Sequence, residues 1–171
     1  MNKLIPLALL AALQALAISS NAHEAHVHGS ATVLLAQDGN KLTLEFDSPL
    51  DNLLGFEHAP RTDKQKQAAK ALLDLMQKPD TLLKLNAEAD CQLATLKIVV
   101  PVLQAISTGK DEHANLHAEY EYACTKVTAL KSLQLSLFDA FPSIHKVDAQ
   151  MAGVRGQAAA TLTPKQRMLA W

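Results

Sequence analysis

Aromatic residues, glycine and net charge are all scarce in this chain of 171 residues. Aromatic side chains make up 4% of it, with one tryptophan, so an extended stacking surface for bases or sugars is not expected. The formal net charge of −1 argues against a nucleic-acid partner, because phosphate-binding domains carry a surplus of Lys and Arg. With six glycines there is no phosphate-cradling loop, and neither Gly-x-Ser-x-Gly nor His-Glu-x-x-His occurs. The sequence therefore does not indicate an enzyme.

What the chain does contain is apolar residues and histidine. Hydrophobic residues make up 49% and charged residues 19%, which excludes wholesale disorder. The length suits one domain with a sizeable core. Seven histidines stand against the single tryptophan, and their positions carry most of the functional information.

The first 22 residues are typical of a secretory signal peptide. Lys3 supplies the positive charge, residues 4–18 form an apolar run, and Ser20 and Ala22 are small residues at the −3 and −1 positions of a cleavage site. The alternative is an uncleaved membrane anchor, for which the run is short. We therefore expect an exported mature protein, residues 23–171, that is a single α+β domain without a membrane span.

An exported chain with two cysteines favours a disulfide between Cys91 and Cys124. The alternative is a thiolate metal site. Such a site needs more closely grouped Cys or His partners, whereas the neighbours of both cysteines are mostly apolar.

Two elements stand out in the first half of the chain. Residues 30–47 predict a β-hairpin, because apolar and polar residues alternate on both sides of Asp38-Gly39. Thr62 and Gln65 form a capping box, and apolar residues at helical spacing follow, which predicts one strong helix over 62–78. Residues 48–61 between them read as an apolar loop that packs against the domain.

The remainder predicts mainly antiparallel strands, and so an α+β fold. The expected extended segments are 82–85, 91–103, 116–124, 133–137 and 145–151, with a closing hairpin made by 158–162 and 168–171. Residues 26–58 and 113–145 contain the same succession of features, namely histidine, strand, turn, strand and apolar loop, at low sequence identity. This similarity is compatible with two pseudo-repeated β-lobes, about 26–90 and 91–171.

Five of the seven histidines lie in two short windows that also hold acidic residues. The windows contain His23, His26 and His28 with Glu24, and His113 and His117 with Asp111, Glu112 and Glu119. Histidines two apart on a strand, or four apart on a helix, lie on one face, where both imidazoles can bind the same metal ion. His58 beside Glu57 is a third contributor, whereas His145 reads as an ordinary strand histidine. Imidazole and carboxylate suit zinc, and imidazole also suits copper.

Several segments of the chain resemble one known family, the ZrgA-type periplasmic zinc-uptake proteins of Gram-negative bacteria. The segments are His26-Val-His28-Gly29-Ser-Ala, Asp38-Gly39, the run from Ser48-Pro49 to His58-Ala-Pro-Arg61-Thr62, the cysteine pair, and Leu137-Phe138-x-x-Phe141-Pro142. The resemblance implies a protein that binds Zn²⁺ and assists zinc acquisition under zinc limitation. By position, its metal chemistry would fall on His26, His28, His58, His113 and His117.

Members of this family often carry a long His- and acid-rich insertion in mid-chain. The corresponding segment here, residues 108–117, is short and holds only His113 and His117, so high-capacity zinc binding is not expected. The full predicted ligand set is His23, His26, His28, His58, His113 and His117, with Glu24, Glu57 and Glu119 as carboxylate support.

Three functions remain open from the sequence. The first is a zinc metallochaperone or buffer that delivers Zn²⁺ to an uptake transporter. The second is a copper-binding protein in which cleavage makes His23 the terminal residue of a histidine brace. The third is a partner-binding β-domain whose histidines are incidental.

Overall fold

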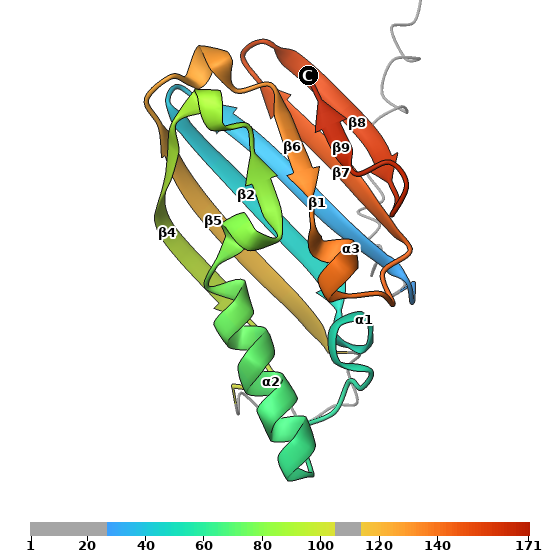
Figure 1. Ribbon diagram of the computed structural model, residues 1–171. Coiled ribbons are helices and arrows are strands. Elements are labelled where there is room, and N and C mark those ends of the chain that lie inside the picture. Colours follow the sequence, from blue (N-terminus) through green and yellow to red (C-terminus); the bar gives the residue numbers. More distant parts are fainter. Residues whose placement is uncertain (1–26, 105–113) are drawn as a thin grey trace, which may run out of the picture.

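The computed structural model describes residues 27–104 and 114–171, which form a layered α+β domain (Figure 1). A six-stranded sheet has the order β4-β5-β2-β1-β7-β8, and a three-stranded sheet has the order β3-β6-β9. Figure 1 shows the smaller sheet and α2 on the same face of the larger sheet. Apolar side chains from both sheets and from α2 form one buried cluster between these layers.

The large sheet contains β1 (Ser30–Asp38), β2 (Lys41–Pro49), β4 (Cys91–Val99), β5 (Asn115–Cys124), β7 (Lys146–Gly153) and β8 (Gly156–Leu162). The small sheet contains β3 (Leu83–Leu85), β6 (Ser132–Leu135) and β9 (Met168–Ala170). The α-helices are α1 (Leu50–Leu54), α2 (Asp63–Met76) and α3 (Leu137–Ala140). Three short 3₁₀ turns are η1 (Pro79–Thr81), η2 (Ala87–Ala89) and η3 (Val127–Ala129).

The predicted hairpin is confirmed as β1 and β2. The strands pair in antiparallel register from Thr32 opposite Asp47 to Asp38 opposite Lys41. Gly39 has a φ of 56°, a left-handed conformation that glycine adopts without strain and that this tight turn requires. Alternate side chains of both strands, such as Val33 and Phe46, are buried in the core, as the period-two pattern predicts.

The predicted helix is also confirmed, as α2. The Thr62 hydroxyl accepts a hydrogen bond from the Gln65 N–H, and the Gln65 side chain accepts one from the Thr62 N–H, which completes the capping box. The helix ends at Met76, two residues earlier than predicted, because Pro79 begins the 3₁₀ turn η1.

Residues 48–61, predicted as a loop, contain the short helix α1. Pro49 precedes the first turn, and Gly55 ends the helix with a left-handed φ of 74°. The Leu50 N–H donates to the carbonyl oxygen of Ala114, 2.8 Å away, which ties α1 to the start of β5. Leu50 is buried in the core and Leu53 and Leu54 pack against it, so the predicted packing of this segment is confirmed.

Two pairings in the sheets differ from the sequence prediction. β1 pairs with β7 in parallel, from Ser30 opposite Lys146 to Ala36 opposite Ala152, so the large sheet is mixed. The predicted closing hairpin at the C-terminus is wrong, because β8 pairs with β7 whereas β9 pairs with β6 in the other sheet. Leu162 and Leu169 are both buried, and the turn between them carries the chain from one layer to the other.

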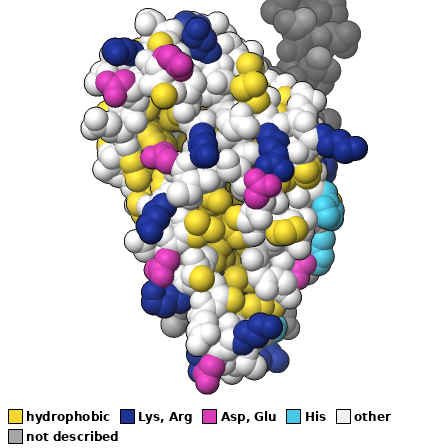
Figure 2. All heavy atoms as spheres, in the orientation of Figure 1, with side chains coloured by type: hydrophobic (Ala, Val, Ile, Leu, Met, Phe, Trp, Pro, Cys, Tyr) yellow, Lys and Arg dark blue, Asp and Glu magenta, His cyan; other side chains and the backbone are white. Residues whose placement is uncertain are grey.

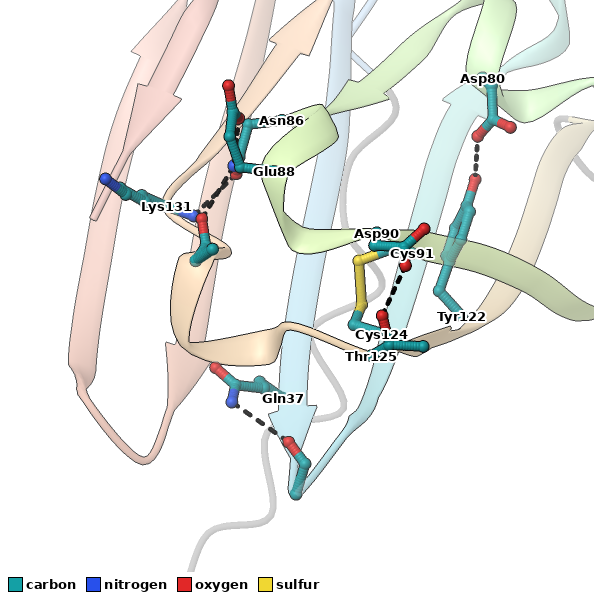
Figure 3. The surroundings of a disulfide bond; sticks show 12 residues. Gln37, Asp80, Asn86, Glu88, Asp90, Cys91, Tyr122, Cys124, Thr125 and Lys131 are labelled. Carbon is teal, nitrogen blue, oxygen red and sulfur yellow. Dashed lines mark hydrogen bonds between the residues drawn. A yellow bond between two sulfur atoms is a disulfide. The ribbon is translucent and has the colours of Figure 1, made fainter.

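The predicted disulfide is confirmed between Cys91 and Cys124, which lie directly opposite each other in β4 and β5 (Figure 3). The two sulfurs are therefore not available as thiolate ligands. Asp90, just before Cys91, has a left-handed φ of 51°, and its carboxylate accepts a 2.6 Å hydrogen bond from the Thr125 hydroxyl. The disulfide and this hydrogen bond together hold the edge strand β4 at its first residue.

Replacing Tyr120 with phenylalanine should lower the free energy of unfolding by about 1 kcal/mol. The Tyr120 ring is fully buried, which raises the pKa of its phenol, and its hydroxyl donates a 2.9 Å hydrogen bond to the carbonyl oxygen of Met76. Tyr120→Phe keeps the ring packing but leaves that carbonyl without this donor. Urea denaturation measures the change, and an unfolding midpoint equal to that of the parent would contradict it.

Candidate functional site

Three of the four described histidines lie at one end of the large sheet. β1 begins there after His28, β7 begins there after His145, and His117 in β5 lies opposite Asp47 near the end of β2. Figure 2 shows histidine side chains at one margin of the visible face, with acidic side chains beside them. The sheet thus places histidines from three distant parts of the sequence at the same end of the domain.

His28 faces two carboxylates, and we refer to His28, Asp51 and Glu57 as the His28 cluster. Nδ1 of His28 is 3.5 Å from Oδ2 of Asp51, and Nε2 is 3.7 Å from Oε1 of Glu57. The His28 side chain is 65% exposed, whereas those of Asp51 and Glu57 are 35% and 22% exposed. An accessible imidazole between two partly shielded carboxylates has the donor types that zinc prefers.

Asn52, a buried residue of α1, fixes the backbone on which the His28 cluster depends. Its Oδ1 accepts a 2.7 Å hydrogen bond from the Gly29 N–H. Its Nδ2 donates to the carbonyl oxygen of Ser30 at 2.9 Å and to the Ser48 hydroxyl at 3.3 Å. Asn52 is 3% exposed, so these partners have little access to water. The side chain therefore holds α1 against the start of β1 and the end of β2.

An open pocket of about 380 Å³ lies beside the His28 cluster. Its lining includes His28, Asp51 and Asn52 from the first half of the chain and Pro142, Ser143 and His145 from the second. His145 lies 117 residues after His28, so no local sequence pattern groups the two histidines. A ligand in this pocket would contact both histidine-bearing segments.

His117 forms a second pairing on the outer face of the sheet. Its Nδ1 is 2.9 Å from Oδ1 of Asp47, and both side chains are half-exposed. A carboxylate on Nδ1 fixes the ring orientation and leaves Nε2 for another partner, as in many metal-ligating histidines. Glu119, predicted as carboxylate support, lies on the same face one row further along, opposite Glu45 and Lys97.

The structure does not bring His58 to the His28 cluster, although its neighbour Glu57 belongs to it. Nδ1 of His58 is 2.9 Å from the carbonyl oxygen of Ala59, and its ring stacks on Phe56 with centroids 5.2 Å apart. These contacts are local, so a role of His58 in metal binding stays a prediction.

The other predicted ligands, His23, Glu24, His26 and His113, lie outside the described residues, as does the predicted signal peptide, residues 1–22. The copper alternative rests on His23 and therefore stays a prediction. None of the helices in residues 27–104 and 114–171 is long and apolar enough to cross a membrane.

Three carboxylates of the site were missed or only partly anticipated from the sequence. Asp51 and Asp47 were not predicted as site residues, whereas Glu57 was predicted only as support. Two features of the sequence could have indicated them. Asp47 occupies an outward-facing position of a predicted strand, and Asp51 and Glu57 are acidic residues within the otherwise mostly apolar segment 48–61.

Within residues 27–104 and 114–171, no three His, Cys, Asp or Glu side chains are arranged to hold a metal ion as they stand. The His28 cluster comes near to such an arrangement, but its N–O distances are those of ion pairs. Metal binding at this place therefore requires its side chains to reorient, which the exposure of His28 permits.

Comparison with known proteins identifies the family. No curated protein matches the sequence. Residues 25–171, which include the whole described domain, match the family described as ZrgA family zinc uptake protein. The chain therefore belongs to the ZrgA family of zinc uptake proteins.

Proposed function

We propose that this protein is a periplasmic zinc-binding protein without catalytic activity, which takes up Zn²⁺ at the His28 cluster and delivers it to an uptake transporter. The observation that carries the proposal is the pair of carboxylates, Asp51 and Glu57, that face the imidazole of His28. Membership in a zinc uptake family supports zinc as the cargo.

The position of the His28 cluster suits reversible binding of Zn²⁺. Asp51 lies in α1, which is anchored to β1 and β2 through Asn52. His28 lies in the segment before β1 and is largely exposed. The anchored carboxylate of Asp51 would attract the cation, and an exposed imidazole can turn toward it or away at low cost. Such a site favours exchange over permanent retention.

The disulfide supports the periplasmic location. Disulfides persist in oxidising compartments and are rare in the cytosol. Cys91 and Cys124 form one in this domain, and the apolar segment at residues 4–18 has the composition of a signal peptide.

Titration of residues 23–171 with Zn²⁺ should show binding that His28→Gln weakens at least about tenfold. The double variant Asp51→Asn, Glu57→Gln should weaken it further, because it removes both carboxylates that offset the charge of the ion. Isothermal titration calorimetry with a competing chelator measures these constants. A parent dissociation constant of about 1 mM or weaker would contradict the proposal.

Two control variants accompany this titration. Asp74→Asn removes a surface carboxylate on α2 that pairs with Lys70, and it should leave the affinity unchanged. His117→Gln reports on the second histidine–carboxylate pairing. If His117→Gln abolishes zinc binding while His28→Gln does not, the cargo site is at His117 and its assignment to the His28 cluster is wrong.

A further inference from the structure

We propose that His145 is a ligand of the same zinc ion as the His28 cluster, so that imidazoles from two distant segments of the chain contact the metal. This inference rests on the proposed function and extends it to a residue that the sequence pattern identifies only as a strand histidine. His145 lies immediately before β7, far from His28 in the chain.

The backbone places His145 beside the segment that carries His28. The N–H groups of His145 and Lys146 both donate to the carbonyl oxygen of Gly29, at 2.8 and 3.1 Å. From this point β7 continues in parallel register with β1. Because Gly29 directly follows His28, the two histidines lie on adjoining backbone segments that hydrogen bonds hold together.

Gly29 also provides the space for the His145 ring. A Cβ atom at position 29 would lie 2.9 Å from Cδ2 of His145, closer than real Cβ contacts occur, and Gly29 has a φ of 80°. A larger residue at this position would be strained and would have to displace the ring. The contact shows that the His145 imidazole lies against the backbone next to His28.

The His145 imidazole is accessible and has no competing role in the described parts of the chain. The residue is exposed, and neither ring nitrogen forms a hydrogen bond or ion pair with any residue in 27–104 or 114–171. His145 and His28 line the same pocket with Asp51. Exposed side chains change rotamer on the picosecond to nanosecond timescale, so both imidazoles can turn toward a shared ion.

Two imidazoles and two carboxylates make a complete donor set for tetrahedral Zn²⁺. His28 already lies at ion-pair distance from Asp51 and Glu57, and His145 lines the same pocket as His28 and Asp51. The metal would then link the start of β1 to the start of β7. Zinc binding should therefore stabilise the pairing of these two strands.

The test compares His145→Gln with the parent and with Ser143→Ala, a change of a pocket residue that has no strong zinc-ligating group. His145→Gln should weaken zinc binding about tenfold or more, whereas Ser143→Ala should leave it unchanged. Without zinc, all three proteins should unfold at the same urea concentration, because Ser143 and His145 are exposed. A second readout is the ¹⁵N chemical shift of the His145 ring nitrogens, which should change on addition of one equivalent of Zn²⁺.

The outcomes separate this inference from the proposed function. If the parent binds zinc and His28→Gln weakens it, but His145→Gln retains the parent affinity and the His145 nitrogens do not shift, His145 is not a ligand and the proposed function stands. If the parent does not bind zinc, both proposals are wrong. If both variants weaken binding and the His145 nitrogens shift, both are supported.

Discussion

Replacing Cys91 and Cys124 together with alanine should lower the free energy of unfolding by about 3–4 kcal/mol. The two cysteines are 33 residues apart, and a cross-link over such a loop removes much of the entropy of the unfolded chain. The effect is large relative to the 5–15 kcal/mol that typically stabilise a domain. We expect the variant to fold but to unfold at a clearly lower urea concentration.

The same change should loosen β4 more than the rest of the large sheet. Among the described residues β4 is an edge strand that pairs only with β5, and several of its side chains are exposed. The disulfide fixes its first residue, whereas Gln104 holds its other end through hydrogen bonds with Val100 and Ile98. Hydrogen exchange should therefore increase most in residues 92–95, which are nearest the lost cross-link.

Reduction of the parent protein is the matched control for the double alanine variant. Reduced parent and variant should unfold at similar urea concentrations, because both lack the same cross-link. A variant whose free energy of unfolding lies within about 1 kcal/mol of the oxidised parent would show that the loop is already restricted in the unfolded state.

Local sequence patterns predicted the elements of this fold well. The alternation of apolar and polar residues in 30–47 predicted the hairpin, because a strand places every second side chain on the same face. Thr62 and Gln65 predicted the start of α2, because a capping box involves residues of a single helical turn. These signals depend only on neighbouring residues, and so they can be read without the fold.

Pairings between distant strands could not be predicted in the same way. Alternation identifies the buried face of a strand but not the strand beside it. The sequences of β1 and β7 therefore do not indicate that the two strands pair in parallel. The C-terminal residues 158–162 and 168–171 looked like a hairpin because they are close in sequence, yet each joins a different sheet. The choice depends on burial of Leu162 and Leu169 in a core that only the whole chain forms.

The same distinction applies to the candidate site. Histidine clustering pointed to His28 and His117, and the structure gives each a carboxylate partner. Those partners, Asp51 and Asp47, were not predicted, because their proximity follows from α1 and from the pairing of β2 with β5. Sequence reasoning found the imidazoles because they are rare residues, and it missed the carboxylates because acidic residues are common on any surface.

Replacing Asn52 with leucine should lower the free energy of unfolding by about 2–5 kcal/mol and also weaken zinc binding at the His28 cluster. The Gly29 N–H and the Ser30 carbonyl oxygen would lose their hydrogen bonds in a buried place, which is the costly case. α1 would then no longer be held against the start of β1. Asp51 and His28, which precede Asn52 and Gly29, would lose their fixed separation.

Asn86→Leu is the matched control for this prediction. Asn86 is likewise an asparagine that joins distant segments, because its Nδ2 donates to the carbonyl oxygen of Ala129 and its Oδ1 accepts from the N–H of Lys131 (Figure 3). It contacts neither α1 nor β1 through these bonds. Its loss should therefore destabilise the domain without changing the zinc affinity of the folded protein.

The two variants separate positioning from general stability. Urea denaturation gives the stability of each, and calorimetry well below the unfolding temperature gives the zinc affinity of the folded protein. Asn52→Ala is a second variant if Asn52→Leu does not fold, since it removes the same hydrogen bonds to Gly29 and Ser30 without placing a larger apolar side chain in the core. If both asparagine variants, at positions 52 and 86, lower zinc affinity equally, Asn52 has no specific part in positioning His28. If only the changes at Asn52 lower it, zinc affinity depends on how α1 is held against the first strand.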